Sequence, residues 1–483
     1  MISFGQNDGR ILSVIGRVAE KERLLKFAQS DESEFVAVYG RRRVGKTYLI
    51  RQTFQDQFAF QHTGIARGRT KEQLRAFGDS LRECGVGSKD GPSDWFAAFN
   101  LLKTVIDQSR AVKKIVFLDE LSYLDTKGSR FIPALEHFWN GWASARTDVL
   151  LVVCGSATSW IINKVIKDKG GLHNRVTGRI SLQPFTLKEC EAYVASRGIV
   201  MTRYQIAETY MVLGGIPFYW KHLEPDLSAD QNIDDLLFAR SNKLEGEFDE
   251  LYSSLFRKPE PYLKLIRALG RHKSGLNRDE LTRVTESSSC GNFTRYLREL
   301  EECGFIRKSV AFGKKSKGAL YQLIDNFTLF HLAFVSENKV NDRHFWSASA
   351  DAQFRVVWEG LAFERLCLQH VNGIKKALGI SGIVSNDGSW QLARTAGHDG
   401  AQVDLLIDRA DGVINLCEMK FASSEYEIKD GEERHVRARR ELFKSSTGTK
   451  KAVHLTYVTT YGVKRNAHSG VVQSQVVLDD LFQ

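Results

Sequence analysis

Three short apolar runs in the first third of the chain have the composition of buried strands. They are residues 34–40 (EFVAVYG), 113–120 (KKIVFLDE) and 149–157 (VLLVVCGSA). Apolar residues at helical spacing follow the first run in residues 48–54 (YLIRQTF). We therefore expect an α/β domain in which the three runs lie in one parallel sheet.

The middle of the chain has helical periodicity. Residues 241–260 are charged and largely helical in pattern, and residues 261–309 predict three helices with short turns. The second of these helices should begin at Asn277 or Arg278. One face of the third helix consists of Phe293, Tyr296, Leu297 and Leu300.

A strand pair is expected over residues 305–323, interrupted by GKKSKG (residues 313–318). Three helices followed by such a pair resemble a winged helix-turn-helix, a module that places a helix on DNA. The lysines of the turn would then contact phosphates, and they are Lys314, Lys315 and Lys317. A packing or regulatory module is the alternative interpretation.

Strands return near the C-terminus. Residues 354–371 predict an amphipathic helix, and residues 389–394 a short strand. Residues 401–408 and 412–421 then predict a hairpin whose turn is residues 409–412. This part of the chain should form a second, separate α/β domain.

Charged residues interrupt both strands of this hairpin. Asp404 lies between apolar neighbours, and Glu418 and Lys420 are two residues apart, so they share one face of the sheet. The residues expected to face the opposite way are Val403, Leu405, Cys417 and Met419.

Composition sets the class of protein. The chain has 483 residues, 42% hydrophobic and 26% charged, which indicates two to four globular domains. We expect no membrane span and no signal peptide, because no apolar run approaches the required length and the N-terminus lacks the pattern. Seven scattered cysteines without a CxxC pair argue against zinc or disulfides and suit the cytoplasm. The net charge of +10 favours, weakly, a nucleic-acid partner.

The sequence GRRRVGKT (residues 40–47) lies between the first strand and its helix, where a phosphate-binding loop belongs. Lys46 would reach the β- and γ-phosphates of ATP, and the Thr47 hydroxyl would bind Mg²⁺. A chance glycine loop is the alternative. The residues expected to contact the nucleotide are Gly40, Arg41, Arg42, Arg43, Val44, Gly45, Lys46 and Thr47.

Polar residues that suit the same site follow the other strands. Asp119 would hold the Mg²⁺ ion, and Glu120 would polarise the attacking water. Ser156 would lie near the γ-phosphate, with a helix cap as the other interpretation. Arg175, with Arg179 near it, would stabilise transferred phosphate charge within the chain or across an interface, unless both are plain surface residues.

Six segments in this order resemble one family. They are VIGRVAEKERL (14–24), VYGRRRVGKT (38–47), IVFLDE (115–120), CGSATSW (154–160), RVTGRISLQPF (175–185) and GGIPFYW (214–220). Together they resemble the archaeal-type ATPases, a family in the STAND branch of the AAA-like P-loop ATPases. The resemblance implies that Gly16 and Arg17 lie near the adenine and that Pro217 senses the nucleotide from a helical lid. It also implies that copies of the chain assemble when ATP is bound.

The spacing of Asp404, Glu418 and Lys420, D-x₁₃-E-x-K, resembles the core of PD-(D/E)XK nucleases. Carboxylates bind Mg²⁺ or Mn²⁺, the metal activates water, and lysine can stabilise the transition state. The resemblance implies that Asp404, Glu418 and a helical glutamate are the metal ligands. That glutamate is Glu364 or, as the weaker candidate, Glu359.

Departures from the nuclease pattern leave a second interpretation open. The proline of the motif name is absent, and Gln402 stands where an acidic residue is frequent. A fold that binds DNA or protein without cutting is therefore the alternative. Residues 425–444 predict a helix with mixed charges, either solvated or tracking DNA with its arginines, which include Arg434, Arg437, Arg439 and Arg440.

The sequence thus predicts an α/β multidomain protein. The expected parts are a P-loop ATPase core (1–180), a helical lid (181–258), a winged helix-turn-helix with linker (259–335) and a nuclease-like domain (336–483). The leading hypothesis is a DNA-acting ATPase whose nucleotide switch controls a metal-dependent endonuclease, in a role such as genome defence. A regulatory or scaffold ATPase, or a chaperone-like or signalling ATPase without a DNA role, are the alternatives.

Overall fold

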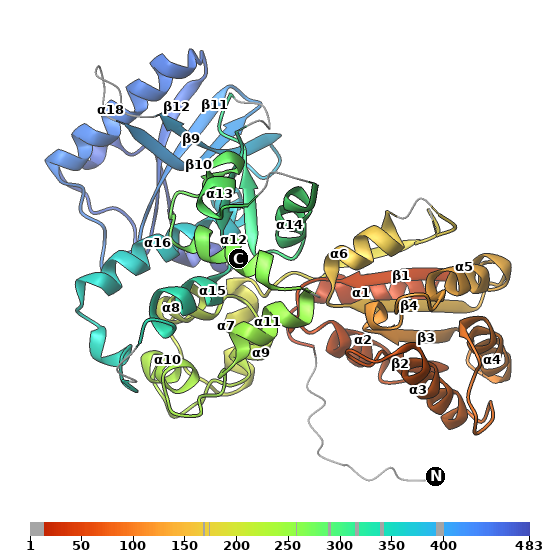
Figure 1. Cartoon of the computed structure of the whole chain (residues 1–483). Coiled ribbons are helices and arrows are strands. Elements are labelled where there is room, and N and C mark those ends of the chain that lie inside the picture. The colour runs from red at the N-terminus through yellow and green to blue at the C-terminus, as the bar shows by residue number, and fades with distance from the viewer. Residues whose placement is uncertain are drawn as a thin grey trace, which may run out of the picture. The chain divides into compact units, whose positions relative to one another are not determined.

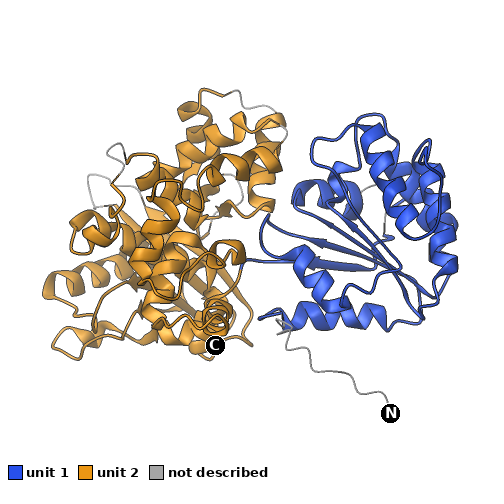
Figure 2. Ribbon diagram, turned by 90° about the horizontal axis from the view of Figure 1, so that it is seen from below, with its two compact units in different colours: residues 1–184 blue, residues 185–483 orange. Residues whose placement is uncertain are grey.

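The chain divides into two compact units, Met1–Pro184 and Phe185–Gln483 (Figure 2). The structure, a computed structural model, describes residues 14–167, 170–172, 174–256, 258–287, 291–313, 318–338, 342–392 and 400–483. The turn lysines Lys314, Lys315 and Lys317 lie outside the described residues. The division into four domains stays a prediction, because the chain separates only once.

Unit 1 is built on a parallel five-stranded sheet in the order β2-β3-β4-β1-β5 (Figure 1). The strands are β1 (Glu34–Tyr39), β2 (Phe60–Thr63), β3 (Lys114–Asp119), β4 (Val149–Gly155) and β5 (Gly178–Ser181). All seven residues of β4 are buried, because a parallel sheet of this kind is covered on both faces. The predicted parallel α/β sheet is confirmed.

Helices connect these strands. The longer ones are α1 (Val18–Ala28), α2 (Lys46–Phe54), α3 (Thr70–Glu83), α4 (Trp95–Gln108) and α5 (Phe131–Gly141). Short turns of helix are η1 (Leu121–Tyr123), η2 (Ala143–Ala145), α6 (Thr158–Ile161) and η3 (Ile162–Ile166). Trp95, Phe99 and Phe131 pack together in the core between the helices and one face of the sheet.

Unit 2 begins with a helical segment. Its helices are α7 (Leu187–Ser196), α8 (Arg203–Leu213), α9 (Pro217–Trp220), α10 (Ala229–Leu237) and α11 (Glu247–Leu255). Thr186, Thr202 and Ser228 cap three of them, each in a capping box with the residue three positions later. These caps explain why the helices begin where they do.

Three helices and a small antiparallel sheet follow. They are α12 (Glu260–Gly270), α13 (Arg278–Val284) and α14 (Gly291–Glu302), with β6 (Leu276–Asn277), β7 (Ile306–Ser309) and β8 (Leu320–Leu323) in the order β6-β8-β7. Asn277 caps α13, which begins at Arg278, one of the two starting residues that the sequence predicts. A linker of α15 (Asn326–Phe330), η4 (His331–Val335) and η5 (Ser347–Ser349) leads on.

The rest of unit 2 contains the second five-stranded sheet, in the order β13-β12-β11-β10-β9. Its strands are β9 (Ser385–Leu392), β10 (Ala401–Arg409), β11 (Val413–Lys420), β12 (Ala452–Thr459) and β13 (Ser474–Val477). The helices are α16 (Gln353–Gln369), α17 (Val371–Ala377), α18 (Asp430–Thr447), η6 (Ser469–Val471) and η7 (Leu478–Phe482). The predicted hairpin is present as β10 and β11, which pair antiparallel.

One expectation for this hairpin is wrong. Val403 does not face away from Glu418, since it shares a core cluster with Ile414 and Leu416, and these two residues lie on the same face of β11 as Glu418. The cause is a β-bulge in β10 between Val403 and Leu406, which inserts one residue relative to β9. A bulge resets the period-2 alternation, and no sequence pattern shows it.

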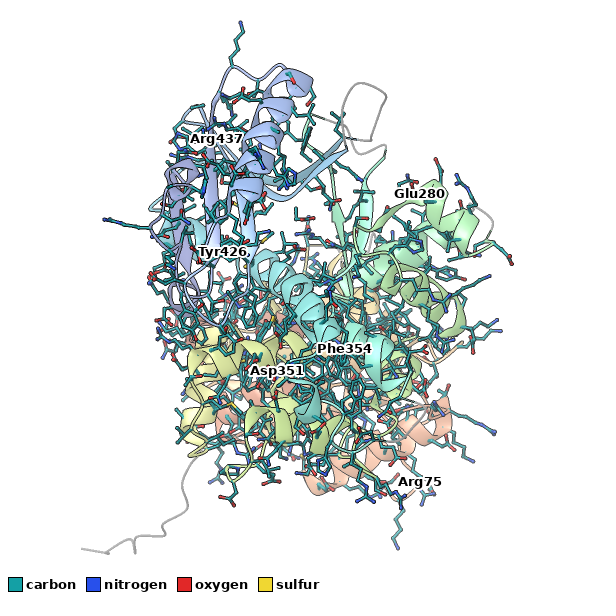
Figure 3. The ribbon with its side chains drawn as sticks, turned by 90° about the vertical axis from the view of Figure 1, so that its left-hand side faces the viewer. Arg75, Glu280, Asp351, Phe354, Tyr426 and Arg437 are labelled. Carbon is teal, nitrogen blue, oxygen red and sulfur yellow. The ribbon has the colours of Figure 1, made fainter. Side chains whose placement is uncertain are left out.

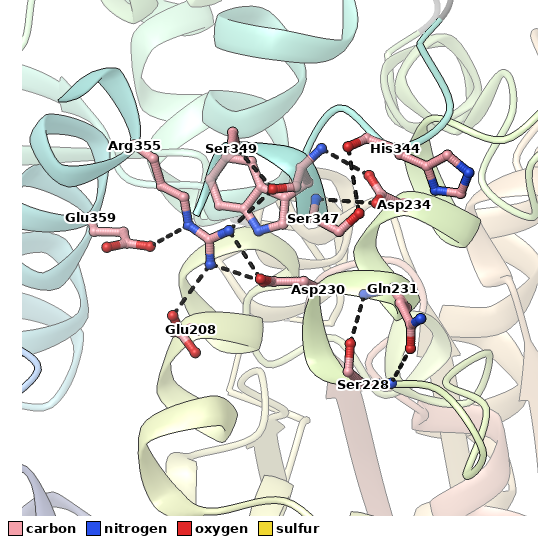
Figure 4. A network of polar contacts seen from close by, with 11 residues as sticks. Glu208, Ser228, Asp230, Gln231, Asp234, His344, Ser347, Ser349, Arg355 and Glu359 are labelled. Atoms are coloured by element: carbon pink, nitrogen blue, oxygen red, sulfur yellow. Dashed lines mark hydrogen bonds and ion pairs between the residues drawn. The ribbon is translucent and has the colours of Figure 1, made fainter. Parts of the chain in front are cut away.

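A buried arginine anchors α16 to the helical segment of unit 2. Arg355 is 4% exposed and donates two hydrogen bonds to the carboxylate of Asp230, at 2.9 and 3.0 Å. It also donates to Glu359 at 2.7 Å and to Glu208 at 3.4 Å (Figure 4). Trp346 accepts a further bond through its carbonyl, and its ring lies 4.4 Å from the guanidinium carbon.

The carboxylates of this network crowd one another. Burial and the nearby charge of Glu359 raise the pKa of Glu208 to about 7. Burial also raises the pKa of Glu359. Arg355 therefore stabilises this group of buried carboxylates, because a buried charge is costly unless it is paired.

We predict that Arg355→Ala lowers the free energy of unfolding of unit 2 by about 3–5 kcal/mol, since it leaves buried carboxylates without their cation. Urea unfolding of the full chain measures the loss, and hydrogen exchange in α8, α10 and α16 locates it. The control is Arg434→Ala, which removes an exposed pair with Asp430 and should cost about 0.5 kcal/mol or less. Equal effects of the two variants would contradict the prediction.

Candidate functional site

The phosphate-binding loop lies at the carboxyl edge of the unit 1 sheet, between β1 and α2. Gly45 precedes α2 with φ 91°, and Arg43 has φ 68°. Gly40 has φ 144°, and a Cβ there would lie 2.2 Å from the carbonyl oxygen of Leu182. The loop therefore requires glycine at position 40 both for its dihedral angle and for the approach of the neighbouring backbone.

Lys46 is buried at the start of α2. Its ammonium donates to the carbonyl oxygens of Gly40 and Arg41, both at 2.9 Å, and to the hydroxyl of Ser156 at 3.2 Å. The lysine, the loop and the end of β4 thus meet at one point. Three acceptors around a buried ammonium satisfy all its donors.

Thr47 and Asp119 lie side by side, because the Thr47 hydroxyl donates to the Asp119 carboxylate at 2.8 Å. Glu120 follows Asp119 and has φ 47°, so the backbone departs from the extended conformation of the strand at this residue. Its carboxylate accepts from the Ser156 hydroxyl at 2.6 Å and from the Ser156 amide at 3.1 Å. All these sequence-predicted residues therefore meet at one edge of the sheet.

Other predicted residues of unit 1 lie further along the chain. Gly16 and Arg17 both have positive φ, and Arg17 is 6% exposed with its guanidinium donating to the Gln183 carbonyl at 2.7 Å. Val44 is buried, whereas Arg42 and Arg43 are half-buried. Arg175 and Arg179 are exposed near β5. Pro217 begins α9 in unit 2.

In unit 2, the pairing of β10 with β11 brings Asp404 beside Glu418. Leu405 is opposite Cys417, so Asp404 and Glu418 each lie next to this cross-strand pair, where β10 bulges. The Gln402 amide donates to the Asp404 carboxylate at 2.6 Å. Lys420 Nζ lies 3.8 Å from Glu418 and 4.0 Å from Glu432 of α18.

Three arginines that the sequence did not assign to this site surround the acids. Arg439 of α18 donates a hydrogen bond to Glu418, so the predicted solvent or DNA contact is replaced, for this residue, by an ion pair. Arg307 of β7 is half-buried and Arg365 of α16 is buried, and Asp404 interacts electrostatically with both. Burial lowers the pKa of each of these two guanidinium groups. Arg307 and Arg365 lie far from the motif along the chain, so motif spacing carries no signal for them.

The two helical glutamates have different surroundings. Glu364 is near the acids of the sheet: burial, followed by the charge of Asp404, raises its pKa to about 7. Glu359, the weaker candidate, belongs instead to the Arg355 network. Among the described residues, no three His, Cys, Asp or Glu side chains are close enough to hold a metal ion. The three expected metal ligands, Glu364, Asp404 and Glu418, thus lie near one another but do not form a preformed metal centre.

Comparisons with known proteins identify the first part of the chain. Residues 15–223 match a family model described as an ATPase domain predominantly from Archaea. This segment is therefore similar to archaeal-type ATPase domains, and the match extends from unit 1 into the first helices of unit 2. The match ends before the second sheet.

Known proteins that match more of the chain share little sequence identity with it. An uncharacterized protein, MJECL04, of Methanocaldococcus jannaschii is 23% identical over 439 residues, which is 89% of this chain and 91% of the relative. The Walker-type ATPase PABY2304 of Pyrococcus abyssi has a TM-score of 0.47 at 16% identity, over 66% of this chain and 96% of that one. The ORC2 protein of Aeropyrum pernix has a TM-score of 0.41 at 15% identity, over 71% and 98%. These two scores are too low to carry a conclusion.

No helix within the described ranges is both long and apolar enough to cross a membrane.

We predict that Gly40→Ala disrupts the phosphate-binding loop, because the added methyl group would meet the Leu182 carbonyl. The variant should lower the melting temperature of unit 1 and lose ATP binding. Gly128→Ala is the matched control: Gly128 also has positive φ, but a Cβ there meets nothing within 4 Å, so only about 1–2 kcal/mol of strain is expected. Calorimetry and nucleotide titration measure both effects, and normal ATP binding by Gly40→Ala would contradict the prediction.

Proposed function

We propose that this ATPase acts on DNA, and that the nucleotide bound by unit 1 controls metal-dependent cleavage of DNA by residues of β10, β11 and α16 in unit 2. The observation that carries the proposal is the coexistence of two groups of acidic and basic residues, one at the phosphate loop and one around Asp404 and Glu418. The first group belongs to an ATPase domain, and the second has the residue types of a nuclease.

The chemistry proposed for unit 1 follows from its contacts. Lys46 would exchange its carbonyl acceptors for phosphate oxygens, and Thr47 with Asp119 would hold a Mg²⁺ ion. Glu120 would accept a proton from the attacking water, and Ser156 would orient Glu120. Arg175, which is exposed, would act on phosphate held by its own chain or by a neighbouring copy if copies assemble on ATP. Gly16, Arg17 and Pro217 would contact the nucleotide as their family resemblance implies.

We predict that Glu120→Gln binds ATP but hydrolyses it at least about 100-fold more slowly, because an amide cannot take the proton. Lys46→Ala is the contrasting variant and should lose binding itself, since it removes the cation that meets the phosphates. Phosphate release and equilibrium nucleotide titration separate the two effects. Hydrolysis by Glu120→Gln at the normal rate would contradict the assignment.

The residues of unit 2 fit a divalent cation by donor type. Glu364, Asp404 and Glu418 would supply the hard oxygen ligands that Mg²⁺ or Mn²⁺ prefers. A bound cation would supply activation of water and neutralisation of charge on the scissile phosphate. Lys420 would contact the phosphate, and Arg439 would release Glu418 to allow the metal to bind. Metal binding would then break the ion pair between Arg439 and Glu418. The affinity of the site for the metal can be measured.

Contact with DNA is proposed for the segment of α12, α13, α14 and the β6-β8-β7 sheet, as a winged helix-turn-helix. Arg295 and Arg298 lie on α14 with about half of each side chain exposed, which would let them reach phosphates. The net charge of +10 favours the same partner.

A specific observation favours a second candidate function. Arg439 already holds Glu418, and the described acids form no ready-made metal site. A regulatory or scaffold ATPase, in which unit 2 binds DNA or protein without cutting, would need no metal there.

We predict that the protein cleaves plasmid, linear or single-stranded DNA in Mn²⁺ or Mg²⁺, and that Asp404→Asn reduces cleavage at least about 100-fold. The substitution removes a charge but keeps the size of the side chain, so the fold should survive. Asp411→Asn is the control, because Asp411 pairs with Arg409 in the turn of the hairpin. No cleavage by the natural sequence under any condition, with ATP hydrolysis intact, would favour the regulatory ATPase.

A further inference from the structure

Unit 2 contains a cavity of about 880 Å³ that neither proposed active site uses. One wall is a single face of α16, which presents Phe354, Val357, Trp358, Leu361 and Arg365 at the spacing of successive helical turns. Figure 3 shows Phe354 on this helix. The opposite walls come from α11, α12 and η4. The volume falls within the range of small-molecule sites.

The charge of the lining is predominantly positive. Arg267, Arg271 and Lys273 are exposed at the cavity, and no ion pair is recorded for their side chains within the described residues. Arg365 adds a fourth cation, and Asp249 and Glu337 are the lining acids. The excess of cations would attract an anion.

Aromatic rings make up much of the remaining surface. Trp358, Phe334 and Phe354 all line the cavity, with Phe334 contacting both of the others. His331 stacks on Phe248 at 4.3 Å, and burial lowers the pKa of His331 to about 4, so its ring is neutral at physiological pH. Exposed faces of Phe354, at 42%, and Val357, at 49%, are available to a ligand.

Two residues that line the cavity, Trp358 and Arg365, each carry a buried donor without an acceptor in the described part of the chain. The Nε atom of Arg365 and the Nε1 atom of Trp358 have no hydrogen-bond partner among the described residues, and both side chains are more than nine-tenths buried. A buried donor without an acceptor costs about 1–3 kcal/mol. In addition, η4 is a π-helical turn, a rare conformation that often marks functional sites.

We infer that this cavity binds a phosphate-bearing ligand with an aromatic base, of the nucleotide class. The four cations would contact the phosphates, and the aromatic side chains would stack on the base. An inorganic anion would contact only the cations, and an apolar molecule only the aromatic side chains. The ligand could be a free nucleotide or a short single strand of nucleic acid, since both carry the same groups. The inference goes beyond the proposed function and does not depend on nuclease activity.

The position of the cavity gives this binding a consequence. Arg365 lines the cavity and also interacts electrostatically with Glu364 and Asp404. A phosphate bound to Arg365 would weaken the electrostatic interaction of that arginine with Glu364 and Asp404. Occupancy would thereby change the charge beside the proposed cleavage site.

The test titrates the full-length Lys46→Ala variant, in which the phosphate loop is disabled, by calorimetry. The probes are AMP, ATP, a thymidine tetranucleotide and inorganic phosphate. We expect saturable binding of a mononucleotide or of the tetranucleotide, and at least tenfold weaker binding after Arg267→Glu with Arg271→Glu. Arg75→Glu, at an exposed residue of α3 in unit 1 (Figure 3), is the matched control and should change nothing.

Which probe binds more tightly identifies the source of the ligand. The inference is overturned if no nucleotide probe binds, if inorganic phosphate binds as tightly as the nucleotides, or if the Arg267 and Arg271 variant binds as the parent does. Circular dichroism of that variant confirms that it is folded. Trp358→Phe provides a second variant, which should weaken nucleotide binding while keeping an aromatic ring in the wall of the cavity.

Discussion

The arrangement of unit 2 depends on one buried cation. Arg355 requires several carboxylates around it, and α8, α10 and α16 supply them through Glu208, Asp230 and Glu359. Because a buried guanidinium without its partners is so costly, the helix that carries Arg355 cannot move independently of the two helices that meet it. The remaining turns of α16 are thereby placed as well. They form the wall of the cavity and bring Glu364 close to the sheet acids.

The same physical theme recurs at both proposed active sites. In unit 1 the ammonium of Lys46 is satisfied by backbone carbonyls and a serine, and in unit 2 Glu418 is held by Arg439. In each case a buried or half-buried charge already has a partner that a phosphate or a metal ion would replace. Ligand binding is then an exchange of partners, which suits a switch better than a rigid site, because the two arrangements differ by a few interactions of similar strength.

Much of this organisation could be predicted from the sequence because it depends on local pattern. Strand runs, the GRRRVGKT loop and the capping residue Asn277 are each signalled within a few neighbouring positions. What could not be predicted depends on contacts between distant segments. The bulge that turns Val403 toward Leu416 has no periodic signature, and nothing near Arg307 or Arg439 indicates that they approach Asp404 and Glu418. The different surroundings of Glu359 and Glu364, the Arg355 network and the sheet acids, likewise depend on contacts between distant segments.

The central claim is that nucleotide in unit 1 governs chemistry in unit 2. The most direct measurement compares DNA cleavage with and without ATP, in Mn²⁺, for the natural sequence and for Lys46→Ala. The account predicts that ATP changes the cleavage rate of the natural sequence and leaves that of Lys46→Ala unchanged. Cleavage that ignores ATP in both proteins, or that responds to ATP equally in both, would contradict it.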